Sequence, residues 1–207
     1  MASFKIDPPR TAVLAIDLQN CFVENSPVAA PDGPVVVANL NKLADEYRRA
    51  GSLIIWTRHA VRPDHYNLGI LGTTVPPASA GVIDDGTDGA ALHRAVDVKA
   101  GDIVLTKPQF GAFQSTELES ILRSRRIDTI VIGGIATNFC CETTAREAHA
   151  REFKVLFLGD GTATFDLRSP DGVMIRRDVI QKASLATLAF GFAEVVTTNE
   201  AISKLSQ

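Results

Sequence analysis

A cysteine stands where an apolar segment of the chain is expected to turn into a helix. Residues 127–132 are short, β-branched and followed by Gly133-Gly134, which is typical of a buried strand. From Cys140 onward the residues are compatible with a helix. A thiol at a helix N-terminus lies at the positive end of the helix dipole, which favours the thiolate, and the free N–H groups there can stabilise an oxyanion. These features predict a nucleophilic cysteine and therefore a hydrolase.

Two further segments place a charged residue directly after an apolar run. Asp17 follows the run 13–16, and Lys107 follows the run 103–106. A carboxylate can act as a general base toward a thiol, and a nearby ammonium can hold both groups and lower the pKa of the thiol. Each residue type also has an ordinary interpretation: a buried inert cysteine, a carboxylate that caps a helix, or a solvated lysine. The three types together favour the catalytic interpretation.

The acid, the lysine and the cysteine, in this order and context, resemble the isochorismatase-like cysteine hydrolases. That superfamily includes nicotinamidases, N-carbamoylsarcosine amidases, ureidoacrylate amidohydrolases and biuret hydrolases. The resemblance runs over nearly the whole chain, from residue 11 to the strand expected at 194–198. It implies a catalytic triad in which Cys140 is the nucleophile, Asp17 the general base and Lys107 the electrostatic partner.

The resemblance also implies the groups that surround the sulfur. The oxyanion donors are the backbone N–H groups of Ala136 and Cys140, and the Ile135–Ala136 peptide is expected to be cis. Thr137 precedes Cys140 by the spacing typical of the family, so Cys140 is preferred over Cys141 as the nucleophile. Cys141 is interpreted as a core residue, and a disulfide between the two, which would block the enzyme, is not expected.

Substrate-binding residues are also inferred from family position. An arginine suits a substrate carboxylate because its guanidinium donates two parallel hydrogen bonds, whereas aromatic residues lie in cores as often as in pockets. The aromatic candidates are Phe22, Trp56, Phe110, Phe113 and Phe139, and the polar candidates are Arg58, His59 and Gln181.

The segment that binds a metal in nicotinamidases is altered in this chain. Those enzymes carry an Asp-x-His segment and a second downstream histidine. Here Thr57 replaces the acid, and Arg58 brings a positive charge where a cation would bind. His59 and His65 alone make a poor site. The sequence therefore predicts no metal and no other cofactor, and it favours the carbamoylsarcosine and ureidoacrylate branches over nicotinamidases.

Strand-like and helix-like segments alternate along the chain. This pattern predicts one α/β domain over residues 1–207, three-layered (α/β/α), with a mainly parallel, Rossmann-like sheet of about six strands. Ligands bind at the carboxyl ends of such strands, where all three triad residues fall. Residues 60–99, rich in Gly, Pro and Asp, are a probable pocket-forming insertion. Strands are expected at 11–17, 52–58, 102–106, 128–133, 153–158 and 194–198, and helices at 34–50, 116–125, 140–151 and 171–188.

Composition excludes several other classes of protein. A net charge of −3 gives no reason to expect nucleic acid or an anionic membrane as partner. The first nine residues do not read as a signal peptide, and no apolar run approaches the ~20 residues of a membrane span. Three cysteines do not make a disulfide framework, so a cytoplasmic location is expected. An apolar segment at 186–192 suggests a homo-oligomer, a dimer or tetramer.

The favoured function is a cysteine-dependent amidohydrolase that acts on a small linear amide or ureido compound and releases ammonia through a thioester. One alternative is isochorismatase-type hydrolysis of a vinyl ether, but those members lack the cysteine, and their dicarboxylate substrates need more cations than Arg58 and Arg62. A second alternative is a non-catalytic redox sensor that uses Cys140 and Cys141. A sensor would tolerate substitution of Asp17 or Lys107, whereas an enzyme would not.

Overall fold

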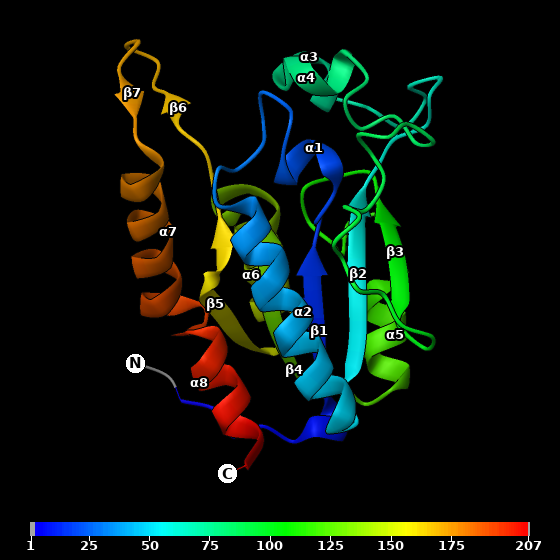
Figure 1. The fold of residues 1–207 in the computed structure, drawn as a ribbon, viewed down its shortest axis with the longest axis vertical. Helices are drawn as coiled ribbons and strands as arrows, with labels where there is room; N and C mark the ends of the chain where they lie inside the picture. The colour runs from blue at the N-terminus through cyan, green and yellow to red at the C-terminus, as the bar shows by residue number, and fades with distance from the viewer. Residues whose placement is uncertain (1–2, 207) are drawn as a thin grey trace.

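Six parallel strands form the central sheet of the computed structural model, which describes residues 3–206 (Figure 1). Their order across the sheet is β3-β2-β1-β4-β5-β8, with every neighbouring pair parallel. The strands are β1 (Thr11–Ile16), β2 (Leu53–His59), β3 (Ile103–Lys107), β4 (Thr129–Ile135), β5 (Lys154–Ala163) and β8 (Glu194–Val196). The predicted parallel α/β architecture is confirmed.

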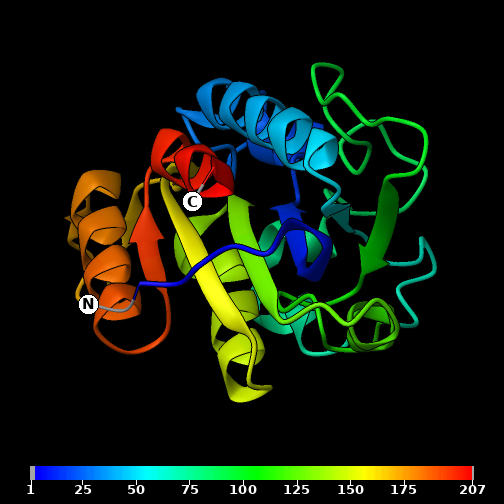
Figure 2. The same ribbon diagram turned by 90° about the horizontal axis from the view of Figure 1, so that it is seen from below.

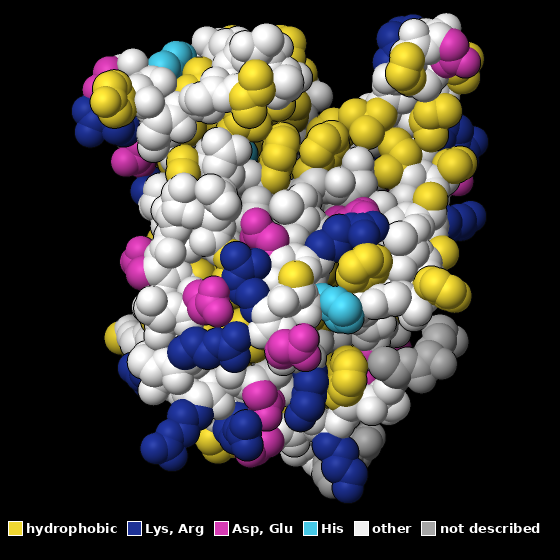
Figure 3. All heavy atoms as spheres, turned by 180° about the vertical axis from the view of Figure 1, so that it is seen from behind, with side chains coloured by type: hydrophobic (Ala, Val, Ile, Leu, Met, Phe, Trp, Pro, Cys, Tyr) yellow, Lys and Arg dark blue, Asp and Glu magenta, His cyan; other side chains and the backbone are white. Residues whose placement is uncertain are grey.

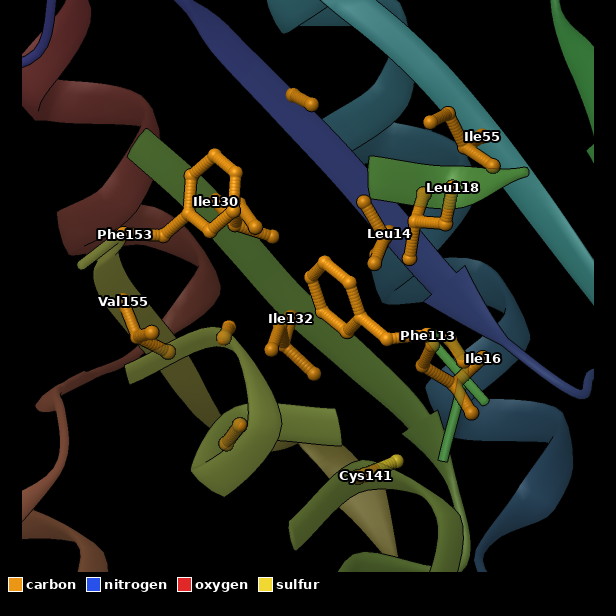
Figure 4. Packing of buried hydrophobic residues seen from close by; sticks show 14 of the residues in the cluster. Leu14, Ile16, Ile55, Phe113, Leu118, Ile130, Ile132, Cys141, Phe153 and Val155 are labelled. Carbon is orange, nitrogen blue, oxygen red and sulfur yellow. The ribbon is translucent and has the colours of Figure 1, made fainter. Parts of the chain in front are cut away.

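Helices cover both faces of this sheet and complete the three layers (Figure 2). Helices α2 (Gly33–Arg49) and α8 (Thr198–Ser203) pack on one face, and α5 (Leu118–Ser124), α6 (Glu142–Ala150) and α7 (Arg177–Gly191) on the other. All six residues of β1 are buried, because alternate side chains serve the two separate cores. Val13 joins the core under α2, while Leu14 and Ile16 join the core under α5 and α6 (Figure 4).

The strand order makes a crevice at the carboxyl edge of the sheet. The chain builds β1, β2 and β3 outward in one direction and then returns to place β4 on the other side of β1. At the carboxyl edge, the chain leaves β1 and β4 in opposite directions, and the crevice between them is where ligands bind in doubly wound sheets. Asp17 follows β1 and Cys140 follows β4, so these two residues flank that crevice.

Short elements stand above this edge (Figure 1). They are α1 (Asn20–Val23), α3 (Leu71–Thr74), α4 (Pro76–Ser79), and a hairpin of β6 (Leu167–Arg168) and β7 (Met174–Ile175). A π-helical turn at Thr137–Cys141 precedes α6, and 3-10 turns lie at Pro8–Arg10 and Lys204–Ser206. Within residues 3–206, no helix combines the length and the hydrophobicity needed to cross a bilayer.

Three predicted helices begin later than expected, and the one predicted at 116–125 starts at Leu118. The helix predicted at 171–188 starts at Arg177, because Pro170, Asp171 and Gly172 form the turn of the β6–β7 hairpin. Gly172 has a φ of 87°, which a glycine adopts readily and a helix does not contain. The helix predicted at 140–151 starts at Glu142, because Cys140 lies in the π-helical turn before it. Such turns are frequent at functional sites.

Gly134 permits the close approach of β4 to β1 beside the site. Its φ is 133°, and a Cβ atom there would overlap the carbonyl oxygen of Ile16. A side chain at this position would therefore push apart the two strands that carry Asp17 and Cys140.

Candidate active site

Asp17, Lys107 and Cys140 meet in one buried cluster, joined by His59. One carboxylate oxygen of Asp17, one ring nitrogen of His59 and the sulfur of Cys140 all lie within 4.8 Å of one another. The Nζ atom of Lys107 is 2.7 Å from Oδ2 of Asp17. The side chains of Asp17 and Lys107 are fully buried, and Cys140 is only 4% exposed. Three distant segments of the chain thus bring a carboxylate, an ammonium and a thiol close together.

The carboxylate of Asp17 is oriented by Thr57 on the neighbouring strand. The backbone N–H of Asp17 donates to Oγ1 of Thr57 at 3.1 Å, and that hydroxyl donates to Oδ1 of Asp17 at 2.5 Å. Asp17 has a φ of 51°, a left-handed conformation that aspartate tolerates better than most residues. These contacts hold Oδ1, while Oδ2 faces the Nζ atom of Lys107.

Lys107 is the last residue of β3 and is held by three acceptors. Its Nζ atom donates to the carbonyl oxygens of Gln109, at 2.9 Å, and Phe110, at 3.0 Å, in addition to its ion pair with Asp17. Burial alone would lower the pKa of this ammonium, but the charge of Asp17 and the sulfur of Cys140 outweigh it and raise the pKa. Lys107 therefore stays charged and has no free donor left for a substrate.

The Cys140 thiol is protonated in the resting site. Burial raises its pKa, the charge of Asp17 raises it further, and Lys107 only partly opposes them. The sequence predicted that the helix dipole and Lys107 would lower the pKa of this thiol and favour the thiolate. The structure corrects this prediction, because desolvation of the sulfur is the larger effect. Attack by the sulfur then requires a group that accepts its proton, and Asp17 lies within range.

The predicted oxyanion donors lie at the same place. The Ile135–Ala136 peptide is cis, as the resemblance implied. Ala136 and Cys140 both line the cavity described below. Oγ1 of Thr137, in the π-helical turn, donates to Oε1 of Gln181 at 2.6 Å, which anchors the turn to α7.

His59 is buried, neutral and incompletely hydrogen-bonded. Its Nδ1 atom is 4.0 Å from the sulfur of Cys140, and its Nε2 atom has no hydrogen-bond partner in the part of the chain that the structure describes. Burial lowers the pKa of His59 to about 4, and the charge of Lys107 contributes to this decrease. At neutral pH the ring is therefore an uncharged imidazole with one donor and one acceptor.

The cluster opens into a cavity of about 230 Å³. Four of the predicted substrate-binding residues line it: Phe22, His59, Phe110 and Phe139. The remaining lining residues were not predicted individually, although many lie within the predicted insertion at 60–99. These are Val28, Leu71, Thr74, Val75, Pro76, Pro77, Ala78, Val82, Ile83, Ile135, Phe165 and Leu167.

The structure places the other four predicted substrate-binding residues outside this cavity. Trp56 is buried in the core under α2, and its Nε1 atom donates to Asp102 at 2.9 Å. Arg58 pairs with Asp85 at 3.1 Å. Both positions have one cause: side chains alternate along β2, so Thr57 and His59 face the buried cluster while Trp56 and Arg58 face away.

Phe113 and Gln181 are corrected for different reasons. Phe113 packs in the core against Phe153, with ring centroids 6.0 Å apart. Gln181 holds the π-helical turn and β5 through Thr137 and Thr162, and it lines a separate polar hollow. Neither side chain is free to contact a substrate in the cavity.

Gln19 and Thr57 are positioning residues that the sequence analysis did not identify. The Nε2 atom of Gln19 donates to the carbonyl oxygens of His59, at 3.0 Å, and Ala90, at 2.9 Å, and its Oε1 atom accepts from the N–H of His59 at 2.6 Å. Gln19 thus joins the ends of β1 and β2 to the loop above them. A polar amide two residues after Asp17 was the available signal.

The residues that come together do not favour a metal ion. Within residues 3–206, one group of potential ligands is close enough, namely Asp17, His59 and Cys140. Lys107 already places a positive charge 2.7 Å from Asp17 and would repel a cation. His65 is directed instead to Asp84, with its Nε2 atom 2.8 Å from Oδ1. The absence of a metal stays a prediction, and elemental analysis of the purified protein tests it.

The pKa of His59 predicts a specific loss of stability in acid. The ring has a pKa of about 4 when folded and 6.5 when unfolded. Between these values the unfolded chain binds the extra proton, so the free energy of unfolding falls as the pH drops from 6.5 to 4. The loss from this group amounts to about 3 kcal/mol. We expect urea unfolding at a series of pH values to show it.

Two variants isolate this contribution. His59→Phe keeps an aromatic ring but cannot titrate, so its stability should depend less steeply on pH between 6.5 and 4 than that of the unsubstituted chain. His149→Gln replaces an exposed histidine and is the matched control. Equal slopes for His59→Phe and the unsubstituted chain would contradict the assignment.

Comparison with known proteins places the chain among hydrolases. The family model for the isochorismatase domain matches residues 11–200. Nicotinamidase 3 of Arabidopsis thaliana is 34% identical over 189 residues, which cover 89% of this chain and 83% of the relative. Ureidoacrylate amidohydrolase RutB of Methylorubrum extorquens is 30% identical over 176 residues, or 75% of this chain and 71% of the relative.

Solved structures agree with this result. A cysteine hydrolase from Pseudomonas syringae pv. phaseolicola has a TM-score of 0.94 and 31% identity, and the match covers 99% of this chain and 96% of that one. The nicotinamidase and the ureidoacrylate amidohydrolase resemble the chain to a similar degree. The comparisons therefore do not separate the nicotinamidase branch from the ureidoacrylate branch.

Proposed function

The chain belongs to the isochorismatase family of hydrolases, and we propose that it is a cysteine-dependent amidohydrolase that cleaves a small linear amide or ureido compound and releases ammonia. One observation carries this proposal. The Asp17 carboxylate, the Lys107 ammonium and the Cys140 thiol are packed together at the wall of a cavity large enough for a small substrate.

The reaction uses these groups in two stages. As the sulfur of Cys140 attacks the substrate carbonyl carbon, Asp17 accepts the thiol proton, and the N–H groups of Ala136 and Cys140 stabilise the oxyanion. Asp17 then transfers the proton to the departing nitrogen, the C–N bond breaks, and ammonia leaves a thioester behind. Asp17 next accepts a proton from the water that attacks the thioester and returns it to the sulfur. Lys107 remains charged throughout and holds Asp17 in place.

Neither alternative function is proposed. Hydrolysis of a vinyl ether does not use the thiol of Cys140. A redox sensor would have no use for a buried Asp17–Lys107 ion pair beside the sulfur. We also propose a cytoplasmic location, which is supported by the three cysteines, all of them free and buried.

Ammonia release and a chemical trap together test the proposal. The purified chain is incubated with a panel of linear primary amides and ureido compounds, and ammonia is measured. Hydroxylamine added during turnover of a primary carboxamide should divert the thioester to a hydroxamate, because it attacks acyl groups on sulfur faster than water does. Ammonia without hydroxamate would contradict the thioester route, and no ammonia from any panel member would contradict the amidohydrolase assignment.

We also expect the chain to assemble into a homo-oligomer through α7. Only Ser184 and Leu188 are buried in this helix, and Phe190 is 96% exposed. Phe190→Glu should therefore reduce the mass measured by light scattering toward that of one chain, since it places a charge in the contact. Val35→Glu, at an exposed apolar position on α2, is the control and should keep the original mass. A single-chain mass for the unsubstituted protein would refute assembly.

A further inference from the structure

The cavity beside Cys140 is almost entirely apolar. Apart from that thiol, its lining side chains are aliphatic or aromatic except for two, His59 and Thr74. Oγ1 of Thr74 already donates to the carbonyl oxygen of Ile70 at 3.1 Å. Seen from behind, hydrophobic side chains gather in the hollow between the β6–β7 hairpin and the segment that carries α3 and α4 (Figure 3).

Aromatic rings form a continuous series along this cavity. Phe22 stacks on His59, with ring centroids 6.5 Å apart, and His59 meets the edge of Phe110 at 5.8 Å. Phe110 lies 5.6 Å from Phe139, which stacks on Phe165 at 5.9 Å. Such a surface binds apolar or planar groups by burial and ring stacking.

Among the described residues, no lysine or arginine lines the cavity. Lys107 is behind it and is saturated by Asp17, Gln109 and Phe110. Arg58, the predicted carboxylate ligand, is directed to Asp85. A carboxylate in this cavity would lose its hydration without gaining a cation, and it would approach the negative charge of Asp17.

Two buried side-chain polar atoms have no hydrogen-bond partner among the described residues: Oδ2 of Asp17, which is ion-paired with Lys107, and Nε2 of His59, a residue that lines the cavity. His59 is only 3% exposed. The ring is neutral, because its pKa of about 4 keeps it unprotonated at physiological pH, so it attracts amides and not anions. The sulfur of Cys140 lies 4.0 Å from its other nitrogen, which places His59 beside the reacting carbon.

We infer that the substrate is an uncharged primary amide with an apolar acyl group, hydrogen-bonded to His59, and that amides carrying a carboxylate are excluded. This inference rests on the proposed function and narrows it, because N-carbamoylsarcosine and ureidoacrylate both carry a carboxylate. The volume of about 230 Å³ limits the acyl group to a small one, since pockets for drug-sized ligands hold ~300–1,000 Å³.

Two pairs of amides of equal shape test the charge requirement. 4-Methylpentanamide is compared with succinamate, and 4-isopropylbenzamide with terephthalamate. Each pair differs only in an isopropyl group that replaces a carboxylate. We expect kcat/KM for ammonia release to be about 100-fold or more higher for the neutral member of a pair. A carboxylated member that equals or exceeds its neutral partner would overturn the inference and leave the amidohydrolase assignment intact.

A designed cation provides the reverse test. Thr74 lines the cavity at an exposed position of α3, so Thr74→Arg would bring a guanidinium to its rim. We expect this variant to raise kcat/KM for the carboxylated amides about tenfold or more. Thr73→Arg adds the same charge at the adjacent exposed residue, which does not line the cavity, and should change nothing. Equal effects of the two variants would indicate a general surface charge effect and contradict the inference.

His59→Phe tests the hydrogen bond. The substitution keeps an aromatic ring and removes both nitrogens, so kcat/KM for the two neutral amides should fall about tenfold or more. Binding is measured by calorimetry in the inactive Cys140→Ala background. There, the added His59→Phe substitution should weaken the binding of these amides. Unchanged binding and turnover would overturn the role of His59. Absence of ammonia from all four amides and from the wider panel would instead overturn the proposed function, and the inference with it.

Discussion

Replacement of Cys140 by alanine is expected to lower kcat for ammonia release by about 10⁴-fold or more, because no thioester forms without the sulfur. The side chain of Cys140 is 4% exposed, and its polar contact is with Nδ1 of His59 at 4.0 Å. The variant should therefore remain folded, with an unfolding midpoint in urea close to that of the unsubstituted chain. Initial rates with the preferred amide and the urea midpoint are the two measurements.

Cys141→Ala is the matched control for this prediction. Cys141 is fully buried and belongs to the same hydrophobic core as Ile132 and Ile16, under α6 (Figure 4). Removal of its sulfur should cost about 1 kcal/mol of stability and leave kcat within a few-fold of the original. Loss of activity in Cys141→Ala with retention in Cys140→Ala would mean that the nucleophile is the other sulfur.

Lys107→Met is expected to cost both activity and about 3–5 kcal/mol of stability. Asp17 and Lys107 are fully buried 2.7 Å apart, so removal of the ammonium leaves an uncompensated carboxylate in the interior. Methionine has a similar shape, which limits the contribution from lost packing. The free energy of unfolding from urea titration and kcat are measured together.

The double variant Asp17→Asn,Lys107→Met separates stability from catalysis. It removes both charges, so it should recover most of the stability lost in Lys107→Met, whereas activity stays absent because the base is gone. The exposed pair Arg62–Asp64 serves as control: Arg62→Met should leave the urea midpoint and kcat close to those of the unsubstituted chain. A double variant as unstable as Lys107→Met would show that the ion pair is not the source of the loss.

The fold followed from periodic patterns in the sequence. Val13, Leu14 and Ile16 belong to a run with no polar member, which requires helices on both faces of a strand, and both cores are present. The beginning of α7 did not follow, because residues 171–176 are compatible with a helix locally while the turn at Pro170 and Gly172 pairs β6 with β7. Here a tertiary hairpin overrode a local pattern.

For the site, the chain order of acid, lysine and cysteine was sufficient to identify the cluster. Parallel strands present their carboxyl ends at one edge, so residues that follow β1, β3 and β4 must converge there. Trp56 and Arg58 were predicted to bind substrate but do not line the cavity, because their neighbours Thr57 and His59 occupy the side of β2 that faces Asp17. The sequence predicts that side chains alternate along β2, but it does not show which set of alternate side chains faces Asp17.

The sequence by itself thus determined the fold, the family and the three residues of the cluster, because each depends on local pattern and on strand direction. Only the tertiary structure decided that burial keeps the thiol of Cys140 protonated, that Lys107 has no donor for a substrate, and that the cavity is apolar with His59 as its one unsatisfied polar side chain. Desolvation and hydrogen-bond saturation depend on all neighbours at once, and most of those neighbours are distant in the chain.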